Sequence, residues 1–380
     1  VVGHHLGSSM EPFTMLQGAI WDNLGLRLDA QFHGQRHPSL TAVCEEFGYC
    51  NNNSKLQQWF RRYESRWVGE YEWMADSWPA ALEDMAAAIK GNDFLTSTDF
   101  VVCGGPGWMC AMYRSVHVVP MLLYFAWPVV PMIPSELRSH FLWQIQALGQ
   151  TVNPATVFVC ANWILAAQFA YQVRLNVPVM RVHGLYVNQT YSPVPTPNGL
   201  HRVVFSRLGQ WTGQAGPAFL EMAWALVKEE QKESKQAFPF ELVFLSIRVR
   251  GVKPIFHATY AELAQFYACV FWPWDMMMML FSELYTITMP LLVPDRHWMH
   301  DIIIHALKQT EVNWWHMRNA SVAGILPSVS GKEFPLPFEP WMTDEPRLPE
   351  VAYWYRLTEF EQFPHVTHFR SLPDMLAKLQ

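Results

Sequence analysis

Residues 270–294 constrain the fold most, because they read as one strand–helix–strand unit. The apolar pair Val270–Phe271 predicts a short buried strand, and a turn rich in proline and tryptophan follows it. Asp275 then stands where it would form the N-cap of a helix. Pro290 introduces a second apolar strand at residues 291–293. This order of elements predicts an α/β fold with a parallel sheet.

The same alternation of apolar runs and helical stretches continues on both sides of a proline-rich segment, residues 191–199. The runs that predict strands are 99–103, 116–125, 156–160, 178–182, 203–205, 241–246, 270–271, 291–293 and 366–369. A chain of 380 residues is long enough for two domains of about 180 residues each. We therefore expect two Rossmann-like domains, residues 1–190 and 200–380, joined by a linker at 191–199.

The composition excludes several classes of protein. Hydrophobic residues make up 51% of the chain and charged residues 16%, which excludes disorder for most of its length and fits sheets covered on both faces by helices. The net charge of −6, without a cluster of lysine and arginine, argues against a nucleic-acid partner. The longest apolar run, residues 118–134, is broken by prolines, so no transmembrane segment is expected.

The spacing of two acids resembles the donor-sugar motif of retaining GT-B glycosyltransferases: an acid, seven residues, a glutamate, and six residues to a proline that opens a strand. The resemblance gives Asp275 the place of the acid near the transferred sugar. It gives Glu283 the place of the glutamate that holds the ribose hydroxyls. Met276 would line the donor site where the family usually has glycine. The resemblance also implies two domains facing each other across a cleft, with the last helix, residues 373–380, packing back against the first domain.

The separation of these acids suits two contacts along one extended ligand. On a single helix, eight residues correspond to a rotation of about 80° and a rise of about 12 Å. Asp275 and Glu283 would then share one side of the helix. They would be too far apart for an acid/base pair of the glycosidase type, whose carboxylates lie within about 10 Å of each other.

A nucleotide-sugar transferase must also stabilise a diphosphate leaving group, for which backbone N–H groups and fixed cations are suited. The resembled family has a basic residue after the first strand of the second domain, and Arg207 matches it. Thr212 stands where the family has a lysine. The candidates for the second positive charge are Arg248, Arg250 and Lys253, which follow the next strand.

The acceptor would bind to loops of the first domain, at the ends of strands that face the cleft. Five loop residues are candidates for this role: Gly3, His4, His5, Gly104 and Gly105. His183 follows the last strand expected in the first domain. The resemblance places Asp275 near the transferred sugar, and we expect Asp275 and His183 to be the catalytic residues.

The sequence has no Asp-x-Asp pair, no Walker loop, no Gly-x-Gly-x-x-Gly fingerprint and no serine nucleophile elbow. We therefore expect neither a metal nor a cofactor. The expected function is transfer of a sugar from a nucleotide-sugar donor to a carbohydrate, lipid or protein acceptor, with retention of configuration. Two alternatives stay open. One is a non-catalytic GT-B-like scaffold that binds sugar or protein, which Thr212 and the methionines at 276–279 favour. The other is a nucleotide-sugar epimerase.

The cysteines do not form a zinc-binding pattern, since none of them belongs to a Cys-x-x-Cys pair. Cys103, Cys160 and Cys269 each end an apolar run, which predicts buried free thiols. Cys44 and Cys50 flank a short turn and could pair in an oxidising compartment.

Three Asn-x-Ser/Thr sequons occur, at Asn52, Asn188 and Asn319. They would be used only in a secretory lumen. The sequence therefore leaves two compartments open, the cytoplasm and the secretory or Golgi lumen.

Overall fold

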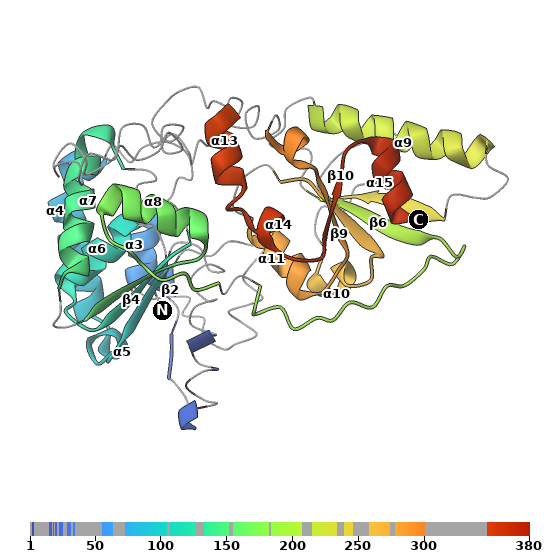
Figure 1. Cartoon of the computed structure of the whole chain (residues 1–380). Helices are drawn as coiled ribbons and strands as arrows, with labels where there is room; N and C mark the ends of the chain where they lie inside the picture. The colour runs from blue at the N-terminus through green and yellow to red at the C-terminus, as the bar shows by residue number, and fades with distance from the viewer. Residues whose placement is uncertain are drawn as a thin grey trace. The chain divides into compact units, whose positions relative to one another are not determined.

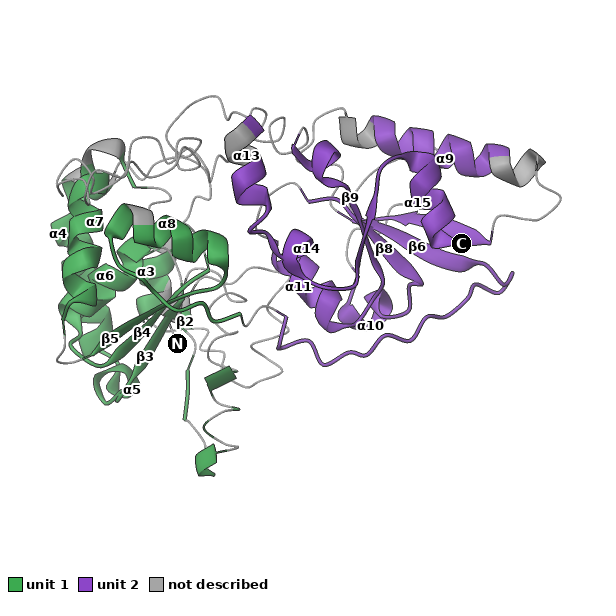
Figure 2. Ribbon diagram, in the orientation of Figure 1, with its two compact units in different colours: residues 1–183, 311–344 green, residues 184–310, 345–380 purple. Residues whose placement is uncertain are grey.

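The structure, a computed structural model, divides the chain into two compact units (Figure 2). Unit 1 comprises residues 1–183 and 311–344, and unit 2 comprises residues 184–310 and 345–380. The residues that the structure describes are 2–3, 15–16, 18, 20, 23–25, 29–31, 33–34, 55–63, 73–104, 107–126, 133–151, 155–181, 184–206, 215–233, 239–245, 258–273, 278–300 and 348–380.

Unit 1 contains a parallel sheet with the strand order β2-β1-β3-β4-β5. Figure 1 labels its strands β2 and β4. Its strands are β1 (Val2–Gly3), β2 (His33–Gly34), β3 (Val101–Gly104), β4 (Met121–Phe125) and β5 (Thr156–Cys160). Its helices are α3 (Lys55–Tyr63), α4 (Trp73–Lys90), α5 (Asp93–Thr96), α6 (Gly107–Val116), α7 (Ser135–Gly149) and α8 (Trp163–Val173). Every residue of β3 and β4 is buried, as expected for strands of a parallel sheet covered on both faces.

Unit 2 contains a second parallel sheet, with the order β10-β9-β8-β6-β7. Its strands are β6 (His201–Ser206), β7 (Phe240–Phe244), β8 (Ala268–Phe271), β9 (Leu291–Pro294) and β10 (Val366–Phe369). Its helices are α9 (Ala215–Glu233), α10 (Tyr260–Leu263), α11 (Met279–Thr286), α13 (Leu348–Tyr355), α14 (Glu359–Gln362) and α15 (Leu372–Leu379).

The described strands of the two sheets follow the same winding order. If the strands of each unit are numbered in chain order, both sheets read second, first, third, fourth, fifth. This is a doubly wound order of the Rossmann-like type, in which the chain reverses its direction of winding between the first and third strands. The α/β class expected from the sequence is therefore confirmed, and the two switch points lie between β1 and β3 and between β6 and β8.

Helices cover both faces of the sheet in unit 2. Val203, Phe205 and Val270 pack with residues of α9 and α15 in one hydrophobic core. Phe271, the neighbour of Val270, instead packs against Phe281 of α11, with 5.6 Å between ring centroids. The alternation of side chains along a strand accounts for this division. None of the described helices is long and apolar enough to span a lipid bilayer.

The last helix, α15, belongs to unit 2. It begins after Ser371, whose side chain accepts a hydrogen bond from the Asp374 N–H. Its buried residues lie in the core of unit 2 and include Met375 and Leu379. The apolar face of α15 is thus buried within unit 2, and the expectation that residues 373–380 pack back against the first domain stays a prediction.

The proline-rich segment 191–199 is also part of unit 2, since the units divide between residues 183 and 184. Its backbone is held by two helix ends. The Tyr191 N–H donates to the Ile287 carbonyl at 3.0 Å, and the Ser192 N–H donates to the Ala264 carbonyl at 2.9 Å. Ile287 and Ala264 are the C-caps of α11 and α10. The segment thus satisfies carbonyl groups that a helix end leaves unpaired. Its expected role as the linker between two domains stays a prediction.

Candidate functional site

The carboxyl ends of β6 and β8 form the switch point of the second sheet, which is where doubly wound proteins bind ligands. Ser206 ends β6 and pairs in register with Phe271, which ends β8. The strands continue to contact each other beyond this pair, because the Trp272 N–H donates to the Ser206 carbonyl at 3.2 Å.

Ser206 is the most informative described residue at this switch point. It is only 1% exposed, and its hydroxyl Oγ has no hydrogen-bond partner among the described residues. Residues paired in a parallel sheet point to the same face, so Ser206 shares the face of Phe271, which α11 covers. A buried hydroxyl without a partner is uncommon in native proteins and calls for an explanation. A ligand group at the end of β6 would supply one.

Trp272 adds a second buried polar atom of this kind. The residue is only 5% exposed, and its indole Nε1 has no hydrogen-bond partner in the part of the chain that the structure describes. The ring lies on the opposite face from Ser206, in contact with Phe219 of α9 at 4.3 Å between centroids. We therefore treat Trp272 as a core residue beside the switch point.

The helix that carries the second acid, α11, begins later than expected. Its N-cap is Met278, whose backbone is extended and whose side chain makes no capping hydrogen bond. The first turn closes there, because the Phe281 N–H donates to the Met278 carbonyl at 3.0 Å. The prediction that Asp275 caps this helix is wrong. The estimated 12 Å separation of the acids therefore no longer applies, since one continuous helix does not carry both of them.

Glu283 is buried in α11 and is already engaged by the protein. Its carboxylate accepts a hydrogen bond from the hydroxyl of Tyr186, a residue 97 positions earlier in the chain. The Tyr186 hydroxyl lies 3.4 Å from the hydroxyl of Tyr260, the first residue of α10. Glu283 is therefore not a surface carboxylate. Sequence reasoning did not identify Tyr186, because nothing local marks it as the partner of a distant acid.

A second buried contact ties α11 to a distant segment. The hydroxyl of Ser282 donates to a carboxylate oxygen of Glu359 at 2.7 Å, and both residues are buried. Adjacent residues of α11 thus bond to segments on either side of it in the sequence. These two contacts fix the position of the helix that flanks the switch point.

Gly184 packs directly against α11. Its φ of +79° lies in the left-handed region, and a Cβ added to it would come within 2.6 Å of the Ser282 carbonyl oxygen. Only glycine fits both constraints. The start of unit 2 is therefore in backbone contact with the helix that carries Glu283.

A surface hollow of about 490 Å³ lies beyond the carboxyl ends of β9 and β10, at the other end of the strand order. It is lined by charged residues and histidines: Asp295, Arg296, His297, Glu361, His368, Arg370, Asp374 and Lys378. The acids and bases pair with one another, since Arg296 bonds to Glu361, Arg370 lies 3.7 Å from Asp295, and Lys378 lies 2.9 Å from Asp374.

The pKa shifts in this hollow follow from the same pairing. The hydrogen bond and the charge of Glu361 raise the pKa of Arg296. Hydrogen bonds from the Arg370 N–H and from Lys378 lower the pKa of Asp374. The acidic and basic side chains of the hollow neutralise one another. We therefore interpret the hollow as a surface ion-pair network and not as an ion-binding site.

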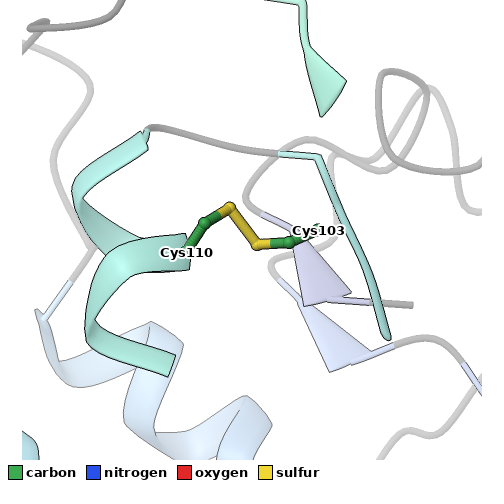
Figure 3. The surroundings of a disulfide bond; sticks show 2 residues. All are labelled: Cys103 and Cys110. Carbon is green, nitrogen blue, oxygen red and sulfur yellow. A yellow bond between two sulfur atoms is a disulfide. The ribbon is translucent and has the colours of Figure 1, made fainter. Parts of the chain in front are cut away.

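At the switch point of the first sheet, Cys103 at the end of β3 forms a disulfide with Cys110 of α6 (Figure 3). The expectation of a free thiol at Cys103 is wrong. The disulfide joins β3 to the first half of α6, so two cysteines seven positions apart in the sequence are adjacent in the fold. The expectation is confirmed for Cys160 and Cys269, which are free and buried, and burial raises the pKa of both thiols.

Most of the site residues expected from sequence lie outside the described residues: Asp275, His183, Arg207, Arg248, Arg250, Lys253, Met276, His4, His5 and Gly105. Of the remainder, Gly3 ends β1, Gly104 ends β3, and Glu283 lies in α11. Among the described residues, no group of three or more His, Cys, Asp or Glu side chains is arranged to hold a metal ion.

No protein-family model matches this sequence, and no curated protein matches it. The class of protein is therefore given by the fold alone: an α/β protein with two parallel, doubly wound sheets.

Proposed function

We propose that the chain is a glycosyltransferase that transfers a sugar from a nucleotide-sugar donor, without a metal, to a carbohydrate, lipid or protein acceptor. The observation that carries the proposal is the buried, unpartnered hydroxyl of Ser206 at the β6–β8 switch point. The segment that resembles the donor-sugar motif supports it further, since β8, α11 and β9 follow one another beside β6.

The roles in this proposal follow from the chemistry of the donor. The Ser206 hydroxyl would donate to a phosphate oxygen, and Arg207, the next residue, would balance the charge of the diphosphate. Arg248, Arg250 and Lys253 are the other candidate cations. Asp275 and His183 are the proposed catalytic residues, Met276 lines the donor site, and retention of configuration and a GT-B cleft are part of the same proposal.

Glu283 would bind the ribose hydroxyls by exchanging its hydrogen bond with Tyr186 for bonds to the nucleotide. The hydrogen bond from Tyr186 keeps the carboxylate oriented, and a tyrosine hydroxyl and a ribose hydroxyl are both neutral O–H donors. The loops of Gly3, His4, His5, Gly104 and Gly105 are the proposed acceptor side.

Nucleotide binding tests the proposal directly. Unfolding temperatures should be measured with a series of nucleoside diphosphates and with the matching nucleosides. A ligand at 100 times its dissociation constant adds about 2.7 kcal/mol of stability, so a diphosphate should raise the unfolding temperature where its nucleoside does not. A series without any shift would contradict the proposal.

Replacement of Ser206 by alanine tests whether the Ser206 hydroxyl binds the diphosphate. The hydroxyl has no partner among the described residues, so its loss should not lower the free energy of unfolding, because an unpaired buried hydroxyl itself costs about 1–3 kcal/mol. Loss of a hydrogen bond to a charged phosphate should weaken diphosphate binding by about 1.5–3 kcal/mol. Ser192→Ala, at an exposed position, is the matched control and should change neither quantity. Unchanged affinity in Ser206→Ala would place the diphosphate elsewhere.

One observation favours the second candidate, a non-catalytic scaffold that binds sugar or protein. Glu283 already has a hydrogen-bond partner in Tyr186 and therefore needs no ligand for its stability. The scaffold predicts that no nucleoside diphosphate shifts the unfolding temperature.

A further inference from the structure

One sequon of the chain lies on an exposed, irregular stretch of unit 2. In the tripeptide Asn188-Gln189-Thr190, both Asn188 and Thr190 are exposed, whereas Tyr186 and Val187 just before it are buried. The chain is in neither helix nor strand from Val187 to Thr190. The two side chains that define a sequon therefore face solvent together.

The backbone holds this stretch at both ends. The Val187 N–H donates to the Gly184 carbonyl at 2.9 Å, and the Tyr191 N–H donates to the Ile287 carbonyl at 3.0 Å. The Asn188 side chain contacts its own neighbour, since its Oδ1 accepts from Gln189 Nε2 at 2.7 Å, an exposed hydrogen bond. A sugar chain linked to Asn188 would project into solvent without displacing a buried side chain. N-linked glycans are bulky and require such a surface position.

An independent observation in unit 1 bears on the compartment in which the chain folds. Cys103 and Cys110 form a disulfide, and both residues are fully buried. Disulfides form and persist in oxidising environments and are rare in the reducing cytosol. The machinery that attaches N-linked glycans operates in such an oxidising, secretory environment, so the disulfide and the exposed sequon point to the same compartment.

We propose that the chain folds in an oxidising secretory compartment and carries an N-linked glycan on Asn188. The glycan comes from a lipid-linked oligosaccharide diphosphate. The amide Nδ2 forms a bond to the anomeric carbon, the bond from that carbon to the diphosphate oxygen breaks, and the lipid diphosphate leaves as the amide loses one proton. The Cys103 and Cys110 thiols lose two protons and two electrons to a disulfide of an oxidoreductase, which is thereby reduced to two thiols. This inference does not depend on the proposed glycosyltransferase activity.

The primary test uses the protein isolated from its own cells. Enzymatic removal of N-glycans in water labelled with ¹⁸O converts a glycosylated asparagine to ¹⁸O-labelled aspartate, which peptide mass spectrometry detects. We expect the label at residue 188. Without reductant, we also expect a linked Cys103–Cys110 peptide, while Cys160 and Cys269 react with an alkylating agent after denaturation. Unlabelled Asn188 would overturn the glycan, and alkylation of Cys103 and Cys110 without reductant would overturn the oxidising compartment.

Three variants make the assignment specific. The chain should be expressed behind a cleavable secretory signal in eukaryotic cells, and its mobility compared before and after glycan removal. Asn188→Gln and Thr190→Ala should each lose the part of the mobility shift that belongs to this site. Thr190→Ser is the matched control, because it alters the same residue but preserves the sequon, and it should keep the shift. A shift that Asn188→Gln leaves unchanged would overturn the proposal.

Discussion

At the scale of single residues, the environment of Glu283 differs most from expectation. A residue expected to bind a nucleotide is buried and bonded to Tyr186. The same contact joins α11 to the segment that enters unit 2. If Glu283 binds a ligand, the same carboxylate must also serve the structural contact with Tyr186.

The Tyr186–Glu283 contact predicts a stability effect. Tyr186→Phe removes a hydrogen bond to a carboxylate, so we expect the free energy of unfolding to fall by about 1.5–3 kcal/mol. The matched control is Tyr191→Phe, which removes a bond between the Tyr191 hydroxyl and the Tyr267 carbonyl at 2.7 Å. That bond joins neutral groups and should cost about 0.5–1.5 kcal/mol. Urea denaturation measures both, and an equal loss in the two variants would contradict the assigned role of the carboxylate.

Gly184 allows a second comparison within the chain. Gly184 and Gly199 have similar backbone angles, with φ of +79° and +77°. Alanine at Gly199 meets nothing within 4 Å, so Gly199→Ala should cost about 1–2 kcal/mol from backbone strain alone. Gly184→Ala adds the contact with the Ser282 carbonyl and should cost more. Denaturation midpoints that show Gly184→Ala to be no worse than Gly199→Ala would mean that α11 moves away freely.

At the scale of elements, the apolar runs predicted the strands better than they predicted the helix ends. β3, β8 and β9 lie within one or two residues of their expected positions. The expected strand at 116–125 is shorter, because α6 continues through Val116 and β4 begins only at Met121. At the expected strand 178–182 the described structure has a single parallel bridge, between Val179 and Cys160.

The N-terminus of α15 gives a pH-dependent prediction. The Arg370 N–H and Lys378 lower the pKa of Asp374, so the folded state binds the proton less readily than the unfolded state does. This contribution to stability is present above the unfolded pKa and is lost as the pH falls through the folded pKa. Asp374→Asn should therefore destabilise the protein near pH 6 and matter progressively less under acidic conditions.

The control for this prediction is the neutral cap of the same helix. Ser371→Ala removes the hydroxyl that accepts from the Asp374 N–H and should cost about 1 kcal/mol. Because a serine hydroxyl does not titrate in this range, its loss should not depend on pH. Urea denaturation at pH values from 6 down to 3 distinguishes the two, and parallel pH profiles for both variants would contradict the role given to the carboxylate.

At the scale of the whole molecule, two sheets with the same strand order occur in one chain. Each has a switch point of the kind that binds ligands, and the two differ in chemistry. The Cys103–Cys110 disulfide lies at the switch point of unit 1. The buried Ser206 hydroxyl, without a partner among the described residues, lies at the switch point of unit 2. The proposed donor site is therefore assigned to unit 2.

Hydrogen exchange tests that assignment. Addition of the nucleoside diphosphate that stabilises the protein most should slow amide exchange in peptides that contain the ends of β6 and β8. Peptides of β4 and β5 in unit 1 serve as the internal control. Their exchange should be unaffected, because a ligand slows exchange only where local unfolding would break its binding site. Protection confined to unit 1 peptides would refute the placement of the donor.

Local patterns in the sequence were sufficient for the α/β class and for the unit at 270–294. A strand buried on both faces is apolar at nearly every position. Runs such as Val101–Cys103 and Leu291–Val293 can therefore be recognised as strands from the sequence. The acid spacing could also be read without a structure. The start of α11 at Met278 could not, because four methionines follow one another at 276–279 and no capping residue among them marks where the helix begins.

Only the tertiary structure decided which distant groups meet. Tyr186 and Glu283 are 97 residues apart, and Ser282 and Glu359 are 77 apart, so no periodicity in the sequence relates them. The pairing of Cys103 with Cys110 depends on how α6 turns back beside β3. Periodicity records which face of an element is buried, whereas the partner on that face depends on the path of the whole chain.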